Sequence, residues 1–87
     1  MEREHFEKIM DGDSDLSAYQ EDNALLGLKI ITKYLPKRGI EGAKHDIIYS
    51  VDVDELLEAG LTEIDAIELN KLNWIIDEDC DCLACFV

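Results

Sequence analysis

The sequence predicts an α+β fold, in which N-terminal helices and a central helical pair pack on a small, mainly antiparallel three-stranded sheet that ends in a C-terminal hairpin. Two observations carry this prediction. Apolar residues recur at a helical period in the first half of the chain. At its C-terminal end, two β-branched and aromatic runs are separated by an acidic turn. With 87 residues, the chain is expected to form one domain over residues 1–87, with residues 1–16 attached more loosely as a helix and a loop.

Two helices are expected first, over residues 2–10 and 17–35. The second carries an apolar stripe at helical spacing, made of Ala24, Leu28, Ile31 and Leu35. We therefore expect Leu28 and Ile31 to lie in the core. Pro36 ends this helix, because the residue before a proline is pushed out of the α region.

A connector and a strand follow the second helix. Gly39 and Gly42 mark the connector as flexible, and its charged residues are mainly basic. Residues 46–51 are β-branched and aromatic, which predicts a strand.

The central helical pair is predicted from its capping residues. Asp52 or Asp54 can begin a short helix, and Gly60 suits the left-handed position that ends it. Thr62 is placed to cap a second helix that runs to about Asn73. Helix, turn and helix resemble a DNA-binding outline, but the second helix is acidic, so we interpret the pair as a packing unit.

The C-terminal hairpin is predicted from two short apolar runs. Residues 74–76 and 83–87 read as strands, and the acidic residues 77–81 form the tip between them.

Charge is distributed unevenly along the chain. The net charge is −13, and residues 45–87 hold twelve carboxylates against a single cation, Lys71. Residues 1–22 sum to −6, whereas residues 23–44 sum to +4. This distribution excludes direct nucleic-acid binding as a function, because phosphates would be repelled over most of the surface. It favours a basic protein surface as the partner, which such a field attracts at long range.

Two groups of carboxylates are the candidate partner-binding residues. The first is an acidic face on the helical pair, formed by Asp52, Asp54, Glu55, Glu58, Glu63, Asp65 and Glu68. The second is the hairpin tip, formed by Asp77, Glu78, Asp79 and Asp81. Carboxylates one helical turn apart lie about 5–6 Å from each other, so such rows can imitate the charge spacing of a nucleic-acid backbone.

Two clusters are weighed as metal sites. Asp11, Asp13 and Asp15 match the start of a calcium loop, but Leu16 stands where that loop needs a glycine. The second cluster has zinc-ligand residue types and consists of Cys80, Cys82 and Cys85. Strand alternation turns the last two of these to opposite faces, so no metal or cofactor is predicted. Without a phosphate loop or a nucleophile motif, a non-enzymatic protein is expected.

The compartment is predicted to be the cytosol. No apolar run approaches the length of a membrane span, so no membrane interaction is expected. The N-terminus lacks the basic and apolar regions of a signal peptide. The three cysteines are odd in number and crowd at one end, which is typical of a reduced protein.

From Gly27 onward, the hydrophobic and turn residues form a pattern that resembles a known class. The residues that carry the resemblance are Gly27, Leu28, Ile31, Lys33, Tyr34, residues 45–49, Leu56, residues 60–62, Leu69, residues 72–74, Phe86 and Val87. The pattern resembles small acidic orphan proteins of bacteriophages and prophages, among which anti-CRISPR and anti-restriction inhibitors are frequent. The resemblance implies a phage-type inhibitor of host defence and carries over no site residues.

Three functions follow from these observations. The leading hypothesis is a non-enzymatic inhibitor that mimics nucleic acid and occupies the basic channel of a host nuclease complex. The first alternative is a small metal-binding or regulatory module that uses the aspartate loop or the cysteines. The second is a homodimer, in which the basic segment 29–44 of one copy contacts the acidic half of the other.

Overall fold

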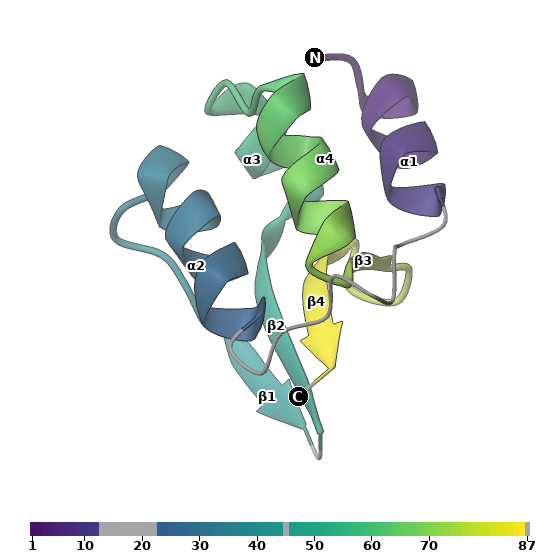
Figure 1. Ribbon diagram of the computed structural model, residues 1–87. Coiled ribbons are helices and arrows are strands. Elements are labelled where there is room, and N and C mark those ends of the chain that lie inside the picture. Colours follow the sequence, from purple (N-terminus) through teal and green to yellow (C-terminus); the bar gives the residue numbers. More distant parts are fainter. Residues whose placement is uncertain (13–22, 45, 87) are drawn as a thin grey trace.

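The computed structural model describes residues 1–12, 23–44 and 46–86, which form an α+β fold. In chain order the elements are α1 (Arg3–Asp11), α2 (Asn23–Tyr34), β1 (Gly42–Lys44), β2 (Ile47–Asp52), α3 (Val53–Glu58), α4 (Glu63–Lys71), β3 (Trp74–Asp77) and β4 (Cys82–Phe86). The helices lie over one side of the sheet, with α4 between α1 and α2 (Figure 1).

The sheet has four strands in the order β1-β2-β4-β3, so the prediction of three strands is wrong. The additional strand is β1, which lies where we expected a flexible connector. It pairs antiparallel with β2, from Gly42 opposite Tyr49 to Lys44 opposite Ile47. Glycine, alanine and lysine have little preference for strands. β1 forms because it pairs with the edge of β2 in a hairpin, and this pairing outweighs the low strand preference of its residues.

The predicted C-terminal hairpin is confirmed. β3 pairs antiparallel with β4, from Trp74 opposite Cys85 to Asp77 opposite Cys82. The acidic tip joins the two strands, and the Asp81 backbone N–H donates to the Asp77 carbonyl over 2.8 Å. Asp81 has a φ of 56°, a left-handed conformation that aspartate adopts more readily than most residues.

The core lies between the sheet and the helices. Its fully buried side chains come from every layer: Phe6 of α1, Ile31 of α2, Leu56 of α3, Leu69 of α4, Trp74 of β3 and Leu83 of β4. α1 is therefore part of the packed core, although the sequence suggested a loosely attached helix. Its amphipathic pattern places Phe6 and Met10, four residues apart, on the buried face.

Helix α2 packs on the core through a face that only partly coincides with the predicted stripe of Ala24, Leu28, Ile31 and Leu35. Asn23, Gly27 and Ile31 are buried, whereas Leu28 is half-buried at the edge of the core. The prediction is thus confirmed for Ile31 and holds in part for Leu28, which is partly buried and packs against the core. The cause is Trp74, whose indole lies directly against Gly27 and leaves no room for a side chain there.

The corner of the helical pair follows its capping signals. Gly60 has a φ of 99°, as predicted for the residue that ends α3. Thr62 caps α4, because its hydroxyl accepts the Asp65 backbone N–H over 3.2 Å. Asp52 stands at the N-cap position of α3 without a side-chain cap bond. In residues 1–12, 23–44 and 46–86, no helix is long and apolar enough to cross a membrane.

Candidate acidic binding surface

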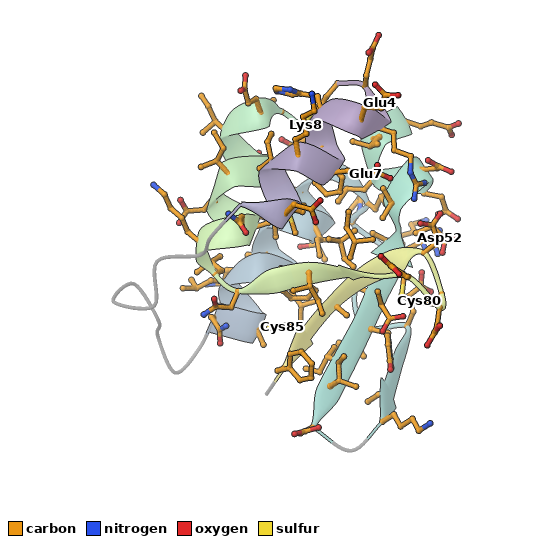
Figure 2. All side chains as sticks on the ribbon, turned by 90° about the vertical axis from the view of Figure 1, so that its right-hand side faces the viewer. Glu4, Glu7, Lys8, Asp52, Cys80 and Cys85 are labelled. Atoms are coloured by element: carbon orange, nitrogen blue, oxygen red, sulfur yellow. A yellow bond between two sulfur atoms is a disulfide. The ribbon has the colours of Figure 1, made fainter. Side chains whose placement is uncertain are left out.

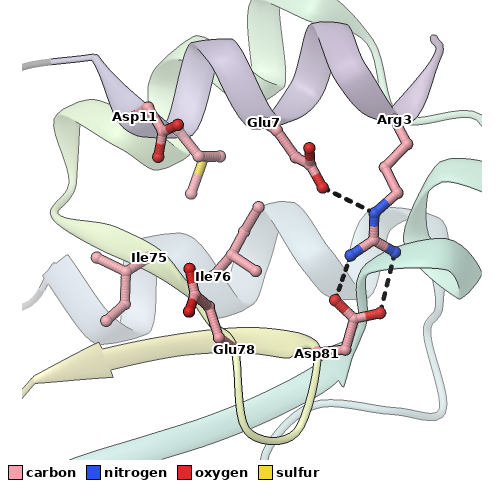
Figure 3. Close-up of a pocket in the computed structure, with 8 residues that line it drawn as sticks. Arg3, Glu7, Asp11, Ile75, Ile76, Glu78 and Asp81 are labelled. Carbon is pink, nitrogen blue, oxygen red and sulfur yellow. Dashed lines mark hydrogen bonds and ion pairs between the residues drawn. The ribbon is translucent and has the colours of Figure 1, made fainter.

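Arg3 joins three elements through carboxylates that the sequence assigned to separate groups. Its Nε donates to Glu7 Oε1 over 2.9 Å within α1, and its Nη1 donates to Asp54 Oδ1 over 2.8 Å at the start of α3. Both Nη atoms also contact the Asp81 carboxylate at the hairpin tip, with Nη1 at 3.0 Å from Oδ2 (Figure 3). The acidic face and the acidic tip therefore meet at one arginine.

These contacts change the proton affinities of the groups involved. Hydrogen bonds from Arg3 lower the pKa of Asp81, and the carboxylates around Arg3 raise the pKa of its guanidinium. Both groups remain charged across the physiological range. The cluster is partly exposed, with 34% of the Arg3 side chain accessible, so water weakens each ion pair.

A second ion pair connects α2 to α4. Lys33 Nζ lies 2.6 Å from Asp65 Oδ2, and the Tyr34 hydroxyl donates to the same carboxylate. Only 16% of the Asp65 side chain is exposed. Hydrogen bonds from Lys33 and Tyr34 lower the pKa of Asp65 and hold it ionised, and the pKa of Lys33 is raised by the same contact.

Two further acids of the predicted surface have positively charged or titratable neighbours. Arg38 contacts Glu55 of α3 and also Glu41 in its own loop. His5 Nε2 lies 3.2 Å from Glu63 Oε1 at the start of α4. Together with the Arg3 and Lys33 contacts, five of the eleven predicted partner-binding acids lie beside a cation or histidine of the same chain: Asp54, Glu55, Glu63, Asp65 and Asp81.

The other six predicted acids form no ion pair with a cation of the described residues. They are Asp52, Glu58, Glu68, Asp77, Glu78 and Asp79. Asp77 is half-buried and stabilises the turn, because its carboxylate accepts the backbone N–H groups of Asp79 and Cys80 over 2.9 and 3.3 Å. The remaining five are exposed, and they are the carboxylates available to an external cation.

Two hollows flank the hairpin tip. The larger, about 510 Å³, lies between α1 and β3 and is lined by Arg3, Glu7, Met10, Asp11, Ile75, Ile76, Glu78 and Asp81 (Figure 3). The smaller, about 400 Å³, lies on the side of β1 and β2 and is lined by Arg38, Glu41, Gly42, Tyr49, Ser50, Asp52, Cys80 and Cys82. Carboxylates line both hollows, so each is suited to a basic group.

The cysteine cluster is not a zinc site in this structure. Cys80 and Cys82 form a disulfide across the hairpin tip, which removes their sulfurs as thiolate ligands and corrects the expectation of reduced cysteines. Cys85 lies farther along β4, in the core on the helix side of the sheet (Figure 2). Burial raises the pKa of its thiol, which makes it a poor nucleophile.

The aspartate loop gives no metal site that the structure describes. Asp11 ends α1 and is exposed, while Asp13 and Asp15 lie outside the described residues. Across residues 1–12, 23–44 and 46–86, no three histidine, cysteine, aspartate or glutamate residues are grouped to hold a metal ion.

Sequence reasoning missed the three cations that organise these acids. Arg3, Lys33 and Arg38 bind Asp81, Asp65 and Glu55, which lie 78, 32 and 17 residues away in the sequence, and such partners leave no local pattern. The one sequence feature that could have indicated these ion pairs was the basic character of residues 23–44, which we interpreted as a possible contact surface for a second copy of the chain. In the structure, Lys33 and Arg38 instead contact acids of the same chain.

Comparison with known proteins gives no family assignment. No family model, curated protein or solved structure matches this chain.

Proposed function

We propose that this protein is a non-enzymatic, phage-type inhibitor that acts in the host cytosol. Its target is a basic, nucleic-acid-binding surface of a bacterial defence complex, of the anti-CRISPR or anti-restriction kind. One observation carries the proposal: exposed carboxylates on α3, on α4 and at the hairpin tip form no ion pair with a cation of the described residues, in a chain whose net charge is −13.

The physical basis is electrostatic attraction between an acidic surface and a basic channel. Ordinary soluble surfaces mix both signs of charge, whereas residues 45–87 contain only Lys71 as a cation. A field of one sign attracts an oppositely charged partner and raises the association rate by about 10- to 1,000-fold at low salt.

The ion pairs divide the acids into two roles. Asp54, Asp65 and Asp81 are already bound to cations of the chain, and they hold α1, α2 and the hairpin tip against the helical pair. Glu68 and Glu78 are exposed on α4 and at the tip, where a partner's lysine or arginine can reach them. The first group stabilises the surface, and the second group contacts the target.

The proposal is tested by capture and competition. The immobilised protein should retain a nucleic-acid-binding complex from a nuclease-treated bacterial lysate, and added DNA or RNA should release that complex. Retention should also weaken steeply between about 50 and 300 mM salt, because screening shortens the reach of exposed charge.

Charge reversal makes the test specific. We expect Glu78→Lys with Asp79→Lys, and separately Glu58→Lys with Glu68→Lys, to lower affinity at least tenfold without unfolding the protein. The matched control is Glu4→Lys with Asp46→Lys. Both residues of the control are exposed, and the pair changes the net charge equally outside the two groups.

Three results would contradict the proposal. These are capture of no nucleic-acid-binding complex, a captured complex that nucleic acid does not displace, and binding that survives both double reversals. A loss of affinity as large in the control as in the test variants would mean that net charge alone governs binding. The acids of α3, α4 and the tip would then not form the contact surface.

A further inference from the structure

Strand β3 is an edge strand whose outer side opens into the larger hollow. In the sheet order β1-β2-β4-β3, the described residues 1–12, 23–44 and 46–86 give it a strand neighbour on one side only. Pairing with β4 leaves alternate backbone N–H and C=O groups of β3 pointing away from the sheet. Ile75 and Ile76 of this strand both line the hollow of about 510 Å³ beside α1 (Figure 3).

The hollow combines an apolar floor with an acidic rim. Met10 and the two isoleucines supply the floor, with Ile76 packed against the core and Ile75 on the opposite face of the sheet, across from Ala84. Asp11 and Glu78 on the rim are exposed and form no ion pair with a cation of the described residues.

Arg3 does not offset this acidity for an incoming ligand. It is the one cation among the described residues that line the hollow, and its guanidinium already donates to Glu7, Asp54 and Asp81. A ligand therefore meets unpaired carboxylates beside an apolar strand edge.

We propose that an extended, lysine- or arginine-containing segment of a partner protein binds in this hollow and adds to β3 as a fifth strand. Its backbone would take up the free hydrogen-bonding groups of β3. Alternate side chains would contact Ile75 and Ile76, and basic side chains would lay their aliphatic stems along Met10 and place their charges near Asp11 and Glu78. This inference rests on the proposed function, because it names the part of the basic partner that docks.

The dimensions and the charge favour such a segment over other occupants. The four residues of β3 span about 13 Å, which pairs with four or five residues of an extended peptide. A second copy of the chain would bring another net charge of −13 to the same rim. Its opposite sheet edge, β1, is only three residues long and holds one cation, Lys44.

The test uses a synthetic probe and the full chain. The probe is an acetylated, amidated hexapeptide of alternating lysine and valine, titrated into isotope-labelled protein and followed by amide chemical shifts. We expect saturable shifts centred on residues 75–78 and slower hydrogen exchange of β3 amides. The same peptide, N-methylated at every interior residue, keeps its charge but loses its backbone donors, and it should bind at least tenfold more weakly.

Two variants and a matched control locate the contact. Glu78→Lys should weaken the probe at least tenfold, and Ile75→Ala should weaken it about threefold or more through lost apolar contact. Asp46→Lys changes the net charge as much as Glu78→Lys does, but Asp46 is exposed beside β2, outside the hollow and outside the predicted partner-binding acids, so it should change affinity less than twofold. Since Ile75 and Glu78 are not fully buried, both variants are expected to fold.

The outcomes separate this inference from the proposed function. Equal binding of the N-methylated and unmethylated probes would overturn strand addition, while the charge-based function would survive. Shifts centred away from β3, an equal effect of Asp46→Lys and Glu78→Lys, or no saturable binding would also overturn the inference. A dimer in sedimentation equilibrium that Glu78→Lys dissociates would assign the hollow to a second copy and overturn it as well.

Discussion

The packing of Gly27 against Trp74 gives a prediction whose sign differs from that of helix propensity. Replacing glycine by alanine inside an exposed helix stabilises it by about 1 kcal/mol. In α2, an added Cβ would lie 2.6 Å from Trp74 Cδ1 and closer still to Nε1 and Cε2 of the indole. Non-bonded carbon atoms in contact normally lie about 3.5–4.0 Å apart, so the nearest atoms of the ring must move by roughly 1.5 Å.

The indole has little freedom to move. Trp74 is 1% exposed, and its Nε1 donates to the Asn23 backbone carbonyl over 3.2 Å. Overpacking costs about 1–3 kcal/mol, and a weakened hydrogen bond costs about 1 kcal/mol more. After the propensity gain is subtracted, we expect Gly27→Ala to lower the free energy of unfolding by about 1–3 kcal/mol.

Urea unfolding followed by far-ultraviolet circular dichroism measures this change, and it also suits variants that lack the chain's one tryptophan. Trp74→Phe removes the indole nitrogen, so the two changes together should be less costly than their sum by at least about 1 kcal/mol. Gly42→Ala is the control, because its Cβ would lie 3.9 Å from Tyr49 Cδ2, an ordinary contact. If Gly27→Ala stabilises the protein, or costs the same with phenylalanine at position 74, the packing of α2 on β3 is wrong.

Three further predictions concern the core, an ion pair and a thiol. Ile31→Ala should cost about 2–5 kcal/mol in urea unfolding, whereas Leu28→Ala, at a half-buried position, should cost clearly less; equal costs would contradict the burial of α2. The pKa of Asp65 is lowered in the folded state, so its stabilising contribution is complete above about pH 4 and is lost as the pH falls through the native pKa. Asp65→Asn should therefore reduce stability by about 1–2 kcal/mol at pH 7, and the gap to the unsubstituted protein should close as the pH falls below the ordinary range of aspartate and through the lowered pKa of Asp65. Cys85 should resist iodoacetamide in the folded protein and react in urea, as followed by mass spectrometry; rapid alkylation of the native state would show that the thiol is accessible.

The parts of the fold that local signals determine were predictable. Gly60 and Thr62 specify the corner between α3 and α4 through backbone conformation and capping, and both act within a few residues. The two apolar runs around the acidic tip specify the β3–β4 hairpin in the same way. In each case the interacting groups are close in sequence, so residue type and spacing contain the needed information.

The parts that depend on a pairing or packing partner, rather than on the preferences of the residues themselves, were not predictable from one sequence. β1 depends on the free edge of β2, and the burial of Gly27 depends on Trp74, which lies 47 residues later in the chain. The disulfide between Cys80 and Cys82 depends on the conformation of the tip, which an odd cysteine count does not reveal. Residue composition alone does not indicate the strand pairing, the glycine–tryptophan contact or the disulfide.

The ion pairs also change how the net charge relates to binding. Pairing Arg3, Lys33 and Arg38 with acids of the same chain does not alter the total of −13, so the long-range field that attracts a basic partner remains. Direct contact with the partner does depend on the ion pairs. A cation of the partner must either displace a cation of this chain from its carboxylate or bind a carboxylate that forms no internal ion pair. The carboxylates of Glu58, Glu68, Glu78 and Asp79 form no ion pair with a cation of the described residues, so a partner's cation can contact them directly. Short-range specificity should therefore depend on these exposed acids, whereas long-range attraction depends on the net charge of the whole chain.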